Sequence, residues 1–142
     1  MSGRHIHELS IANELSALSQ VRSEVTTAIH EGGFPESYIN RLLIAVDEAV
    51  TNIIEHGYEG TPAGTGRIDI RIEVDPDLFA ITITDQGESF DPRSATDVDI
   101  ERHVAAGRSG GLGVFLIRKI MDIVDYHHET GRHNKLTMIK RR

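Results

Sequence analysis

The alternation of apolar and polar positions predicts five strands in this chain. Residues 67–74 alternate strictly between apolar and charged side chains, which is typical of a strand with one face in water. Residues 78–84 form a second strand, and the turn at residues 75–77 favours an antiparallel hairpin between the two. The other expected strands are residues 5–10, 123–127 and 136–140, the last two joined by a turn around Gly131.

Helical spacing of apolar residues predicts a helix on each side of this hairpin. The first begins after Asn13, a residue type that favours the N-cap, and ends at Gly32 and Gly33. The other covers Val114 to Met121. Both helices are expected to contribute one apolar face to the core.

A further helix between these two has the broadest apolar face. It begins at Pro35, with Glu36 or Ser37 as its cap, and runs to about His56, where Gly57 ends it. Because one face is apolar and the other polar, this helix is expected to lie against a sheet.

The order of these elements favours an α+β fold. Strands and helices follow one another as β-α-α-β-β-loop-α-β-β, which is not the alternation of a doubly wound parallel sheet. We therefore expect a two-layer sandwich, with a mostly antiparallel or mixed sheet and helices on one face. Residues 1–142 suit a single domain. Residues 86–110 show little periodicity, apart from a possible short helix at 98–105, and a stretch this long is more often functional than idle.

Charge and composition narrow the function classes. The net charge is −7, from 22 acidic and 15 basic residues, and aromatic residues are few. Nucleic-acid binders usually carry a basic face and stacking rings, so we expect no nucleic-acid partner. The chain has no cysteine and no long apolar run, so we expect a cytoplasmic protein without a membrane segment.

Two polar stretches could carry chemistry. Glu48 and Asn52 are four residues apart in the second helix, so they lie on one side of it, and an amide oxygen suits Mg²⁺ while a carboxylate can accept a proton. Asp85 ends a strand, where a carboxylate can accept a hydrogen bond from an amine such as that of adenine, and Gly87 permits close approach of a flat ligand. Taken singly, each is better explained without a function, Glu48 and Asn52 as a solvated helix face and Asp85 to Gly87 as a turn.

A third stretch is rich in glycine and precedes the last helix. Residues 107–111 fit the G-x-S-x-G pattern around Ser109, but the residues before it do not form the strand that a hydrolase nucleophile elbow needs. The alternative is a mobile loop that leads into a helix N-terminus, whose unpaired amides attract phosphate, with Arg108 beside it. The chain contains no Walker A pattern.

Together the three stretches resemble the GHKL ATPases, which include gyrase and the sensor histidine kinases. Residues 48–58 (EAVTNIIEHGY) resemble the N box, residues 85–92 (DQGESFDP) the first glycine box and residues 107–118 (GRSGGLGVFLIR) the second. Within this group the chain is most similar to the stand-alone anti-sigma-factor serine kinases, including a final strand with a Leu-Thr pair at 136–137. The implied fold is the Bergerat fold.

The resemblance implies a role for each matching residue. Asn52 would hold Mg²⁺ on the ATP phosphates, and Glu48 would be the general base. Asp85 would bind the adenine amino group, with Gly87 below the ring and Thr137 supporting through water. The implied lid consists of Gly110, Gly111, Leu112 and Gly113, with Arg108 reaching the γ-phosphate.

The implied function is an ATP- and Mg²⁺-dependent protein serine/threonine kinase. It would bind a sigma factor or similar regulator and phosphorylate a small anti-anti-sigma (STAS-like) antagonist, and the family commonly forms homodimers. Two alternatives remain open: a nucleotide-responsive binding module without phosphoryl transfer, and an orphan histidine-kinase catalytic domain.

Overall fold

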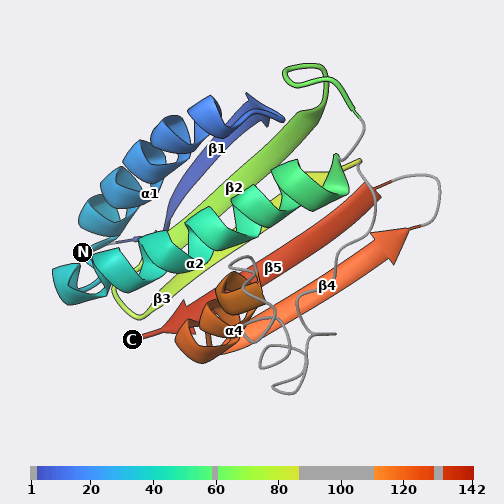
Figure 1. Ribbon diagram of the computed structural model, residues 1–142. Helices are drawn as coiled ribbons and strands as arrows, with labels where there is room; N and C mark the ends of the chain where they lie inside the picture. The colour runs from blue at the N-terminus through green and yellow to red at the C-terminus, as the bar shows by residue number, and fades with distance from the viewer. Residues whose placement is uncertain (1–2, 59–60, 87–110, 130–132) are drawn as a thin grey trace.

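The protein is described by a computed structural model that covers residues 3–58, 61–86, 111–129 and 133–142 (Figure 1). Its five strands are β1 (His5–Ala12), β2 (Arg67–Asp75), β3 (Leu78–Asp85), β4 (Ile123–Glu129) and β5 (His133–Arg141). They form one sheet in the order β1-β2-β3-β5-β4. Each of the four ladders between these strands is antiparallel, so the described sheet is not mixed.

Three helices lie on the same face of this sheet, as Figure 1 shows. They are α1 (Leu18–Gly32), α2 (Ile39–Asn52) and α4 (Gly111–Ile120). Short 3-10 turns, η1 (Leu15–Ala17) and η2 (Glu36–Tyr38), precede α1 and α2, and a π-helix, η3 (Ile53–Gly57), follows α2. The α+β two-layer sandwich expected from the sequence is confirmed.

The core lies between the helices and the inner face of the sheet. Strand alternation places every second side chain of β2 and β3 there, and α1 and α2 cover them with their apolar faces. Fully buried members include Ile68, Ile72, Phe79, Ile81, Ile83, Met138, Val21, Val25, Ile29 and Leu42. Burial of each such side chain is worth about 1.5–3 kcal/mol, so this interface holds the two layers together.

Asn13 is not the N-cap that its position suggests. Strand β1 extends to Ala12, and the chain then makes η1 before α1 begins. The buried side chain of Asn13 accepts the backbone N–H of Gly66 at 2.7 Å and donates to the carbonyl oxygen of Pro62 at 3.3 Å. Asn13 thus fastens the loop before β2 to the end of β1, and this long-range use displaces the local cap.

The start of α2 also differs from the expectation. Glu36 and Ser37 lie inside η2, and Tyr38 occupies the N-cap position of α2 without a side-chain cap. A 3-10 turn satisfies backbone groups that a cap would otherwise bind, so no capping side chain is needed. The predicted caps at Glu36 or Ser37 are therefore wrong, although the helix itself is confirmed.

The ends of α1 and α2 agree better with the sequence. Gly33 ends α1 in the left-handed conformation, with a φ of 73°, which glycine adopts without strain. Beyond α2 the chain continues as η3 to Gly57, so the helical region ends where the sequence predicts. π-helical turns are frequently found at functional sites, which directs attention to this end of α2.

The remaining boundaries shift by a few residues. Helix α4 begins at Gly111, three residues before the expected Val114, and β4 and β5 are longer than predicted. The expected short helix at 98–105 and the turn at Gly131 lie outside the described residues. Among the helices in the described part of the chain, none combines the length and hydropathy needed to cross a bilayer.

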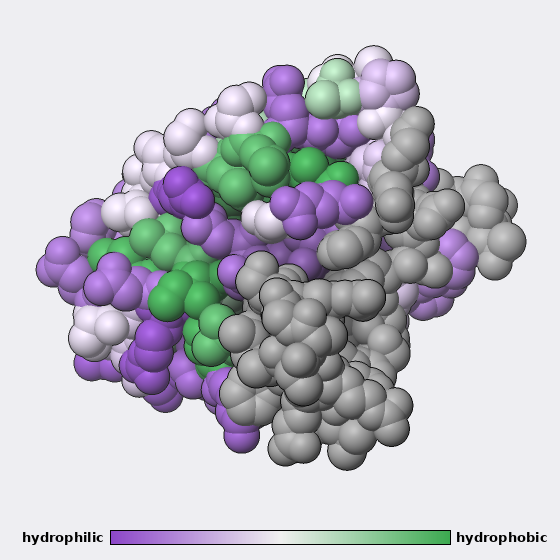
Figure 2. Space-filling view, viewed as in Figure 1, coloured by the Kyte–Doolittle hydropathy of each residue, from purple (hydrophilic) through white to green (hydrophobic). Residues whose placement is uncertain are grey.

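The helical face of the molecule mixes hydrophobic and hydrophilic side chains (Figure 2). Two large apolar residues on these helices are exposed, namely Ile44 of α2 at 43% and Leu116 of α4 at 38%. Single exposed apolar residues are normal on a protein surface, and they matter only where they adjoin a functional group.

Candidate functional site

The C-terminal half of α2 carries the two polar residues of the first candidate stretch. Glu48 and Asn52 both lie in α2, one turn apart, as the sequence predicts. Asn52 is buried, with 3% of its surface exposed, whereas Glu48 is half-buried. A buried amide beside a partly exposed carboxylate is an arrangement that can bind and react at the edge of a core.

The amide of Asn52 faces a narrow pocket beneath the helices. Besides Asn52 and Asp85, the pocket is lined by Ala49, Ile53, Ile117, Tyr126 and Leu136. The Nδ2 atom of Asn52 has no hydrogen-bond partner among the described residues. A buried donor without a partner lowers the free energy of unfolding by about 1–3 kcal/mol. Because Nδ2 of Asn52 does not stabilise the fold, we infer that it is available to bind a ligand.

Asp85 reaches the same pocket from the end of β3. It follows Ile81 and Ile83 on the inner face of that strand, and only 5% of its surface is exposed. Its Oδ1 atom accepts a hydrogen bond from Nδ2 of Asn134 at 3.0 Å. The fold thus brings Asn52 and Asp85, from separate candidate stretches, to one pocket.

The pocket has little free space in this conformation. Its volume is about 10 Å³, enough for one water molecule. A second hollow of about 170 Å³, which Arg67, Gln86 and His133 help to line, also borders Asp85. Asp85 therefore lies between a closed pocket and a more open one. A nucleobase can enter the closed pocket only if the neighbouring side chains move aside.

Thr137 does not face this pocket. In β5 it pairs with Thr82 of β3 and lies between the buried residues Leu136 and Met138, so its side chain is on the outer face of the sheet. Asp85 is on the inner face, so a water molecule cannot bridge the two side chains. The residue of β5 that does contact Asp85 is Asn134: strand alternation from Leu136 places Asn134 on the inner face, and the strand register sets it opposite Asp85.

The glycine-rich stretch is described only in part. Gly111, Leu112 and Gly113 form the first turn of α4, and the first turn of a helix presents unpaired backbone N–H groups. Helix α4 packs against α2, and its Ile117 lines the pocket of Asn52. Gly87, Arg108, Ser109 and Gly110 lie outside the described residues.

The surroundings of Glu48 raise the pKa of its carboxyl group. Burial, the negative charge of Asp47 and that of Glu55 together raise the pKa of Glu48 above its ordinary value. Asp47 itself is bound by Arg22 of α1, whose Nε lies 3.0 and 2.8 Å from the two carboxylate oxygens. A raised pKa strengthens a carboxylate as a general base, provided that it remains ionised.

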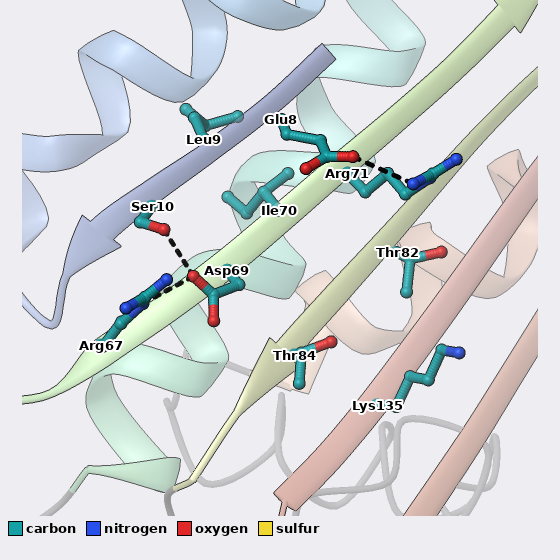
Figure 3. A pocket seen from close by; sticks show the side chains of 10 residues that line it. All are labelled: Glu8, Leu9, Ser10, Arg67, Asp69, Ile70, Arg71, Thr82, Thr84 and Lys135. Atoms are coloured by element: carbon teal, nitrogen blue, oxygen red, sulfur yellow. Dashed lines mark hydrogen bonds and ion pairs between the residues drawn. The ribbon is translucent and has the colours of Figure 1, made fainter. Parts of the chain in front are cut away.

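A broader hollow lies elsewhere, on the outer face of the sheet (Figure 3). Its volume is about 530 Å³, and it contains neither Asn52 nor Asp85. Four of its charged residues are paired with one another: Arg71 contacts Glu8 at 3.0 Å, and Arg67 contacts Asp69, which also accepts a hydrogen bond from Ser10. We assign the candidate site to the Asn52 pocket because a buried carboxylate and an unpartnered amide meet there.

Known proteins resemble this chain over nearly its whole length. The family model of the histidine kinase-like ATPase domain matches residues 11–140. The serine-protein kinases RsbW of Staphylococcus aureus strains JH9 and Newman are each 32% identical over 128 residues, which is 87% of this chain and 80% of theirs.

A solved structure shares the fold. A crystal structure of the RsbU and RsbW domains of a Mycobacterium tuberculosis protein matches 96% of this chain with a TM-score of 0.67 and 18% identity. The chain spans 32% of that longer protein, so the likeness concerns the fold. The match over residues 11–140 decides the family: the chain belongs to the histidine kinase-like ATPase domain family.

Proposed function

We propose that this chain is an ATP-dependent protein serine kinase of the anti-sigma type. The observation that carries the proposal is the meeting of buried Asn52 and Asp85 in one pocket, with Glu48 one turn from Asn52. The 32% identity to serine-protein kinases supports the same reaction for this chain. Family membership supports ATP as the nucleotide.

The nucleotide would be held at its adenine base and at its phosphates. Asp85 accepts a hydrogen bond from the exocyclic amine of adenine, with Gly87 below the ring. The amides of Gly110, Gly111 and Gly113, with Leu112 between them, bind the phosphates at the start of α4, and Arg108 adds a charge-assisted contact.

Mg²⁺ fits the donor set of this site. Mg²⁺ would be held through the Oδ1 atom of the buried Asn52, because a hard cation prefers oxygen ligands, whereas the unpartnered Nδ2 atom is a donor and would face an acceptor of the nucleotide or a water molecule. Bound Mg²⁺ would neutralise charge on the phosphates, while water and phosphate oxygens complete its ligands. Asn52 orients the phosphates and supplies no proton.

Glu48 acts on the incoming hydroxyl group. As the serine oxygen forms its bond to the γ-phosphorus, the proton of that hydroxyl passes to the Glu48 carboxylate. The bond from the γ-phosphorus to the bridging oxygen breaks, and ADP leaves with its electron pair. Because Glu48 is only half-buried, a protein substrate can reach its carboxylate.

The partner would be a small anti-anti-sigma (STAS-like) protein that presents the serine. Ile44 lies one turn before Glu48 on the same side of α2 and is 43% exposed, so it offers an apolar contact beside the base. A sigma factor or similar regulator would be the second partner, and exchange between the two requires a cytoplasmic location. A homodimer through the outer face of the sheet, which none of the described helices covers, or through a sheet edge stays a prediction, which sedimentation would check.

The test is phosphoryl transfer from γ-labelled ATP. The purified chain is incubated with Mg²⁺ and with antagonist proteins encoded in the same genome, with EDTA as the control. The proposal predicts Mg²⁺-dependent label on the antagonist that is stable to acid. Acid-labile label would indicate phosphohistidine and an orphan histidine-kinase domain, and ATP binding without any transfer would indicate a binding module.

A further inference from the structure

We infer that Asn134 is a positioning residue that holds the Asp85 carboxylate for adenine and thereby makes the site select ATP over GTP. The inference rests on the proposed function, in which Asp85 recognises the base. It concerns a residue outside the three motif stretches, contributed by the last strand of the sheet.

The contact between the two side chains is built into the sheet. Asn134 and Asp85 are direct partners in the antiparallel ladder of β3 and β5, and both point to the inner face. Asn134 is 1% exposed, and its Nδ2 lies 3.0 Å from Oδ1 of Asp85. A buried polar pair fixed by strand register has little freedom to rearrange.

The direction of the hydrogen bond follows from chemistry. An ionised carboxylate only accepts, so the amide group of Asn134 must turn its N–H toward Asp85. Its carbonyl oxygen then faces Nδ1 of His128, the ladder partner of Asn134 in β4, with which it forms a hydrogen bond. His128 must donate that bond, and this second contact holds the amide in the orientation that Asp85 needs.

Base selectivity follows from this orientation. Adenine presents an exocyclic amine, which donates to a carboxylate, whereas guanine presents a carbonyl oxygen at the same position, which the carboxylate repels. Without the amide of Asn134, the carboxylate of Asp85 loses the donor that holds its Oδ1 atom in place. A carboxylate that can rotate meets the adenine amine in a poorer geometry, so the binding of ATP weakens more than that of GTP and the discrimination falls.

The test compares the affinities of the full chain for ATP and GTP by calorimetry. Asn134→Leu keeps the size of the side chain and removes the donor, and His128→Ala removes the exposed residue that orients it. Thr137→Val, in the same strand but on the outer face, is the matched control. We expect the ATP-to-GTP preference to fall by roughly tenfold in Asn134→Leu, by less in His128→Ala, and not at all in Thr137→Val.

A merely structural role for Asn134 predicts another pattern. It would weaken the binding of both nucleotides and leave their ratio unchanged, and that outcome overturns the inference while leaving the proposed function intact. If Asn134→Leu does not fold, as circular dichroism would reveal, an unchanged ratio in His128→Ala overturns it instead. A wild-type chain that binds neither nucleotide would refute the proposed function as well.

Discussion

The hydroxyl oxygen of Tyr58 accepts a hydrogen bond from the backbone N–H of Gln86 at 3.1 Å. The same hydroxyl donates to the carbonyl oxygen of Arg67 at 2.7 Å, and the ring lies against Gly66, where a Cβ atom would come within 2.5 Å of it. Tyr58 follows η3 directly, so it fastens the end of the N-box helix to the strand end that carries Asp85.

Replacing Tyr58 by Phe removes this hydroxyl alone. We expect a loss of about 1–3 kcal/mol in the free energy of unfolding, because two partly buried hydrogen bonds, to the backbone of Arg67 and of Gln86, are removed. ATP binding should weaken too, since Asp85 adjoins Gln86. Urea denaturation and calorimetry measure both, with Tyr38→Phe as the control; equal values for the two variants would contradict this role.

The acid side of the pH–rate profile should report Glu48. Its raised pKa means that the base is protonated, and transfer lost, as pH falls through that value. Replacing Asp47 by Asn removes a negative charge beside Glu48, lowers the pKa of Glu48 and moves this acid limb to lower pH. The control is Glu8→Gln on the outer face of the sheet, which should not move it; an unmoved limb in Asp47→Asn would argue against Glu48 as the titrating base.

His7 ties β1 to α1 in a pH-dependent way. Its Nδ1 lies 2.7 Å from Glu24 and its Nε2 2.9 Å from Glu31. Burial favours the neutral ring, but the hydrogen bonds and negative charges of these two glutamates outweigh it and raise the pKa of His7 above 6.5.

Because the folded-state pKa of His7 is raised, its stabilising effect is fully present below 6.5 and disappears as pH rises through the higher value. The stability difference between wild type and His7→Gln, measured in urea, should therefore be larger at pH 6 than at pH 9. The control is Gln20→Ala at an exposed position of α1, which changes no titratable group and should show no such trend. A difference that grows with pH would have the wrong sign for this account.

Ile44 should matter for the protein substrate and not for the nucleotide. Ile44→Asn places an uncharged polar group at an exposed position beside Glu48, so transfer to the antagonist should slow by about tenfold or more through weaker docking, with no new charge near the base. The ATP dissociation constant should be unchanged. Leu15→Asn is the control, because Leu15 is 50% exposed in η1. Equal transfer by the two variants would exclude docking at Ile44.

Local patterns predicted the fold more reliably than its boundaries. Period-two alternation located β2, because a half-buried sheet forces apolar residues to one side. Capping residues were less informative, since Asn13 bonds to Pro62 and Gly66 across the fold instead of to its own helix. That competition depends on tertiary structure, which residue type alone does not reveal.

The sequence predicts the site residues that belong to a recognisable motif. It does not predict which side chains the strand faces and the strand register bring to the pocket. Asn52 and Asp85 were singled out separately, and the fold brings them to one pocket. Thr137 was chosen from a motif, although alternation with Leu136 places its side chain on the other face of the sheet. Asn134 has no motif, and its importance appears only through the strand register that sets it opposite Asp85.

Glu48 is proposed to accept the proton of the serine hydroxyl during phosphoryl transfer, and Glu48→Gln tests this most directly. ATP affinity and the rate of label transfer to the antagonist are measured side by side. The account predicts an ATP dissociation constant within about twofold of wild type and a transfer rate reduced by roughly 10²–10⁴-fold. Transfer at the wild-type rate, or a loss of ATP binding equal to the loss of transfer, would contradict it.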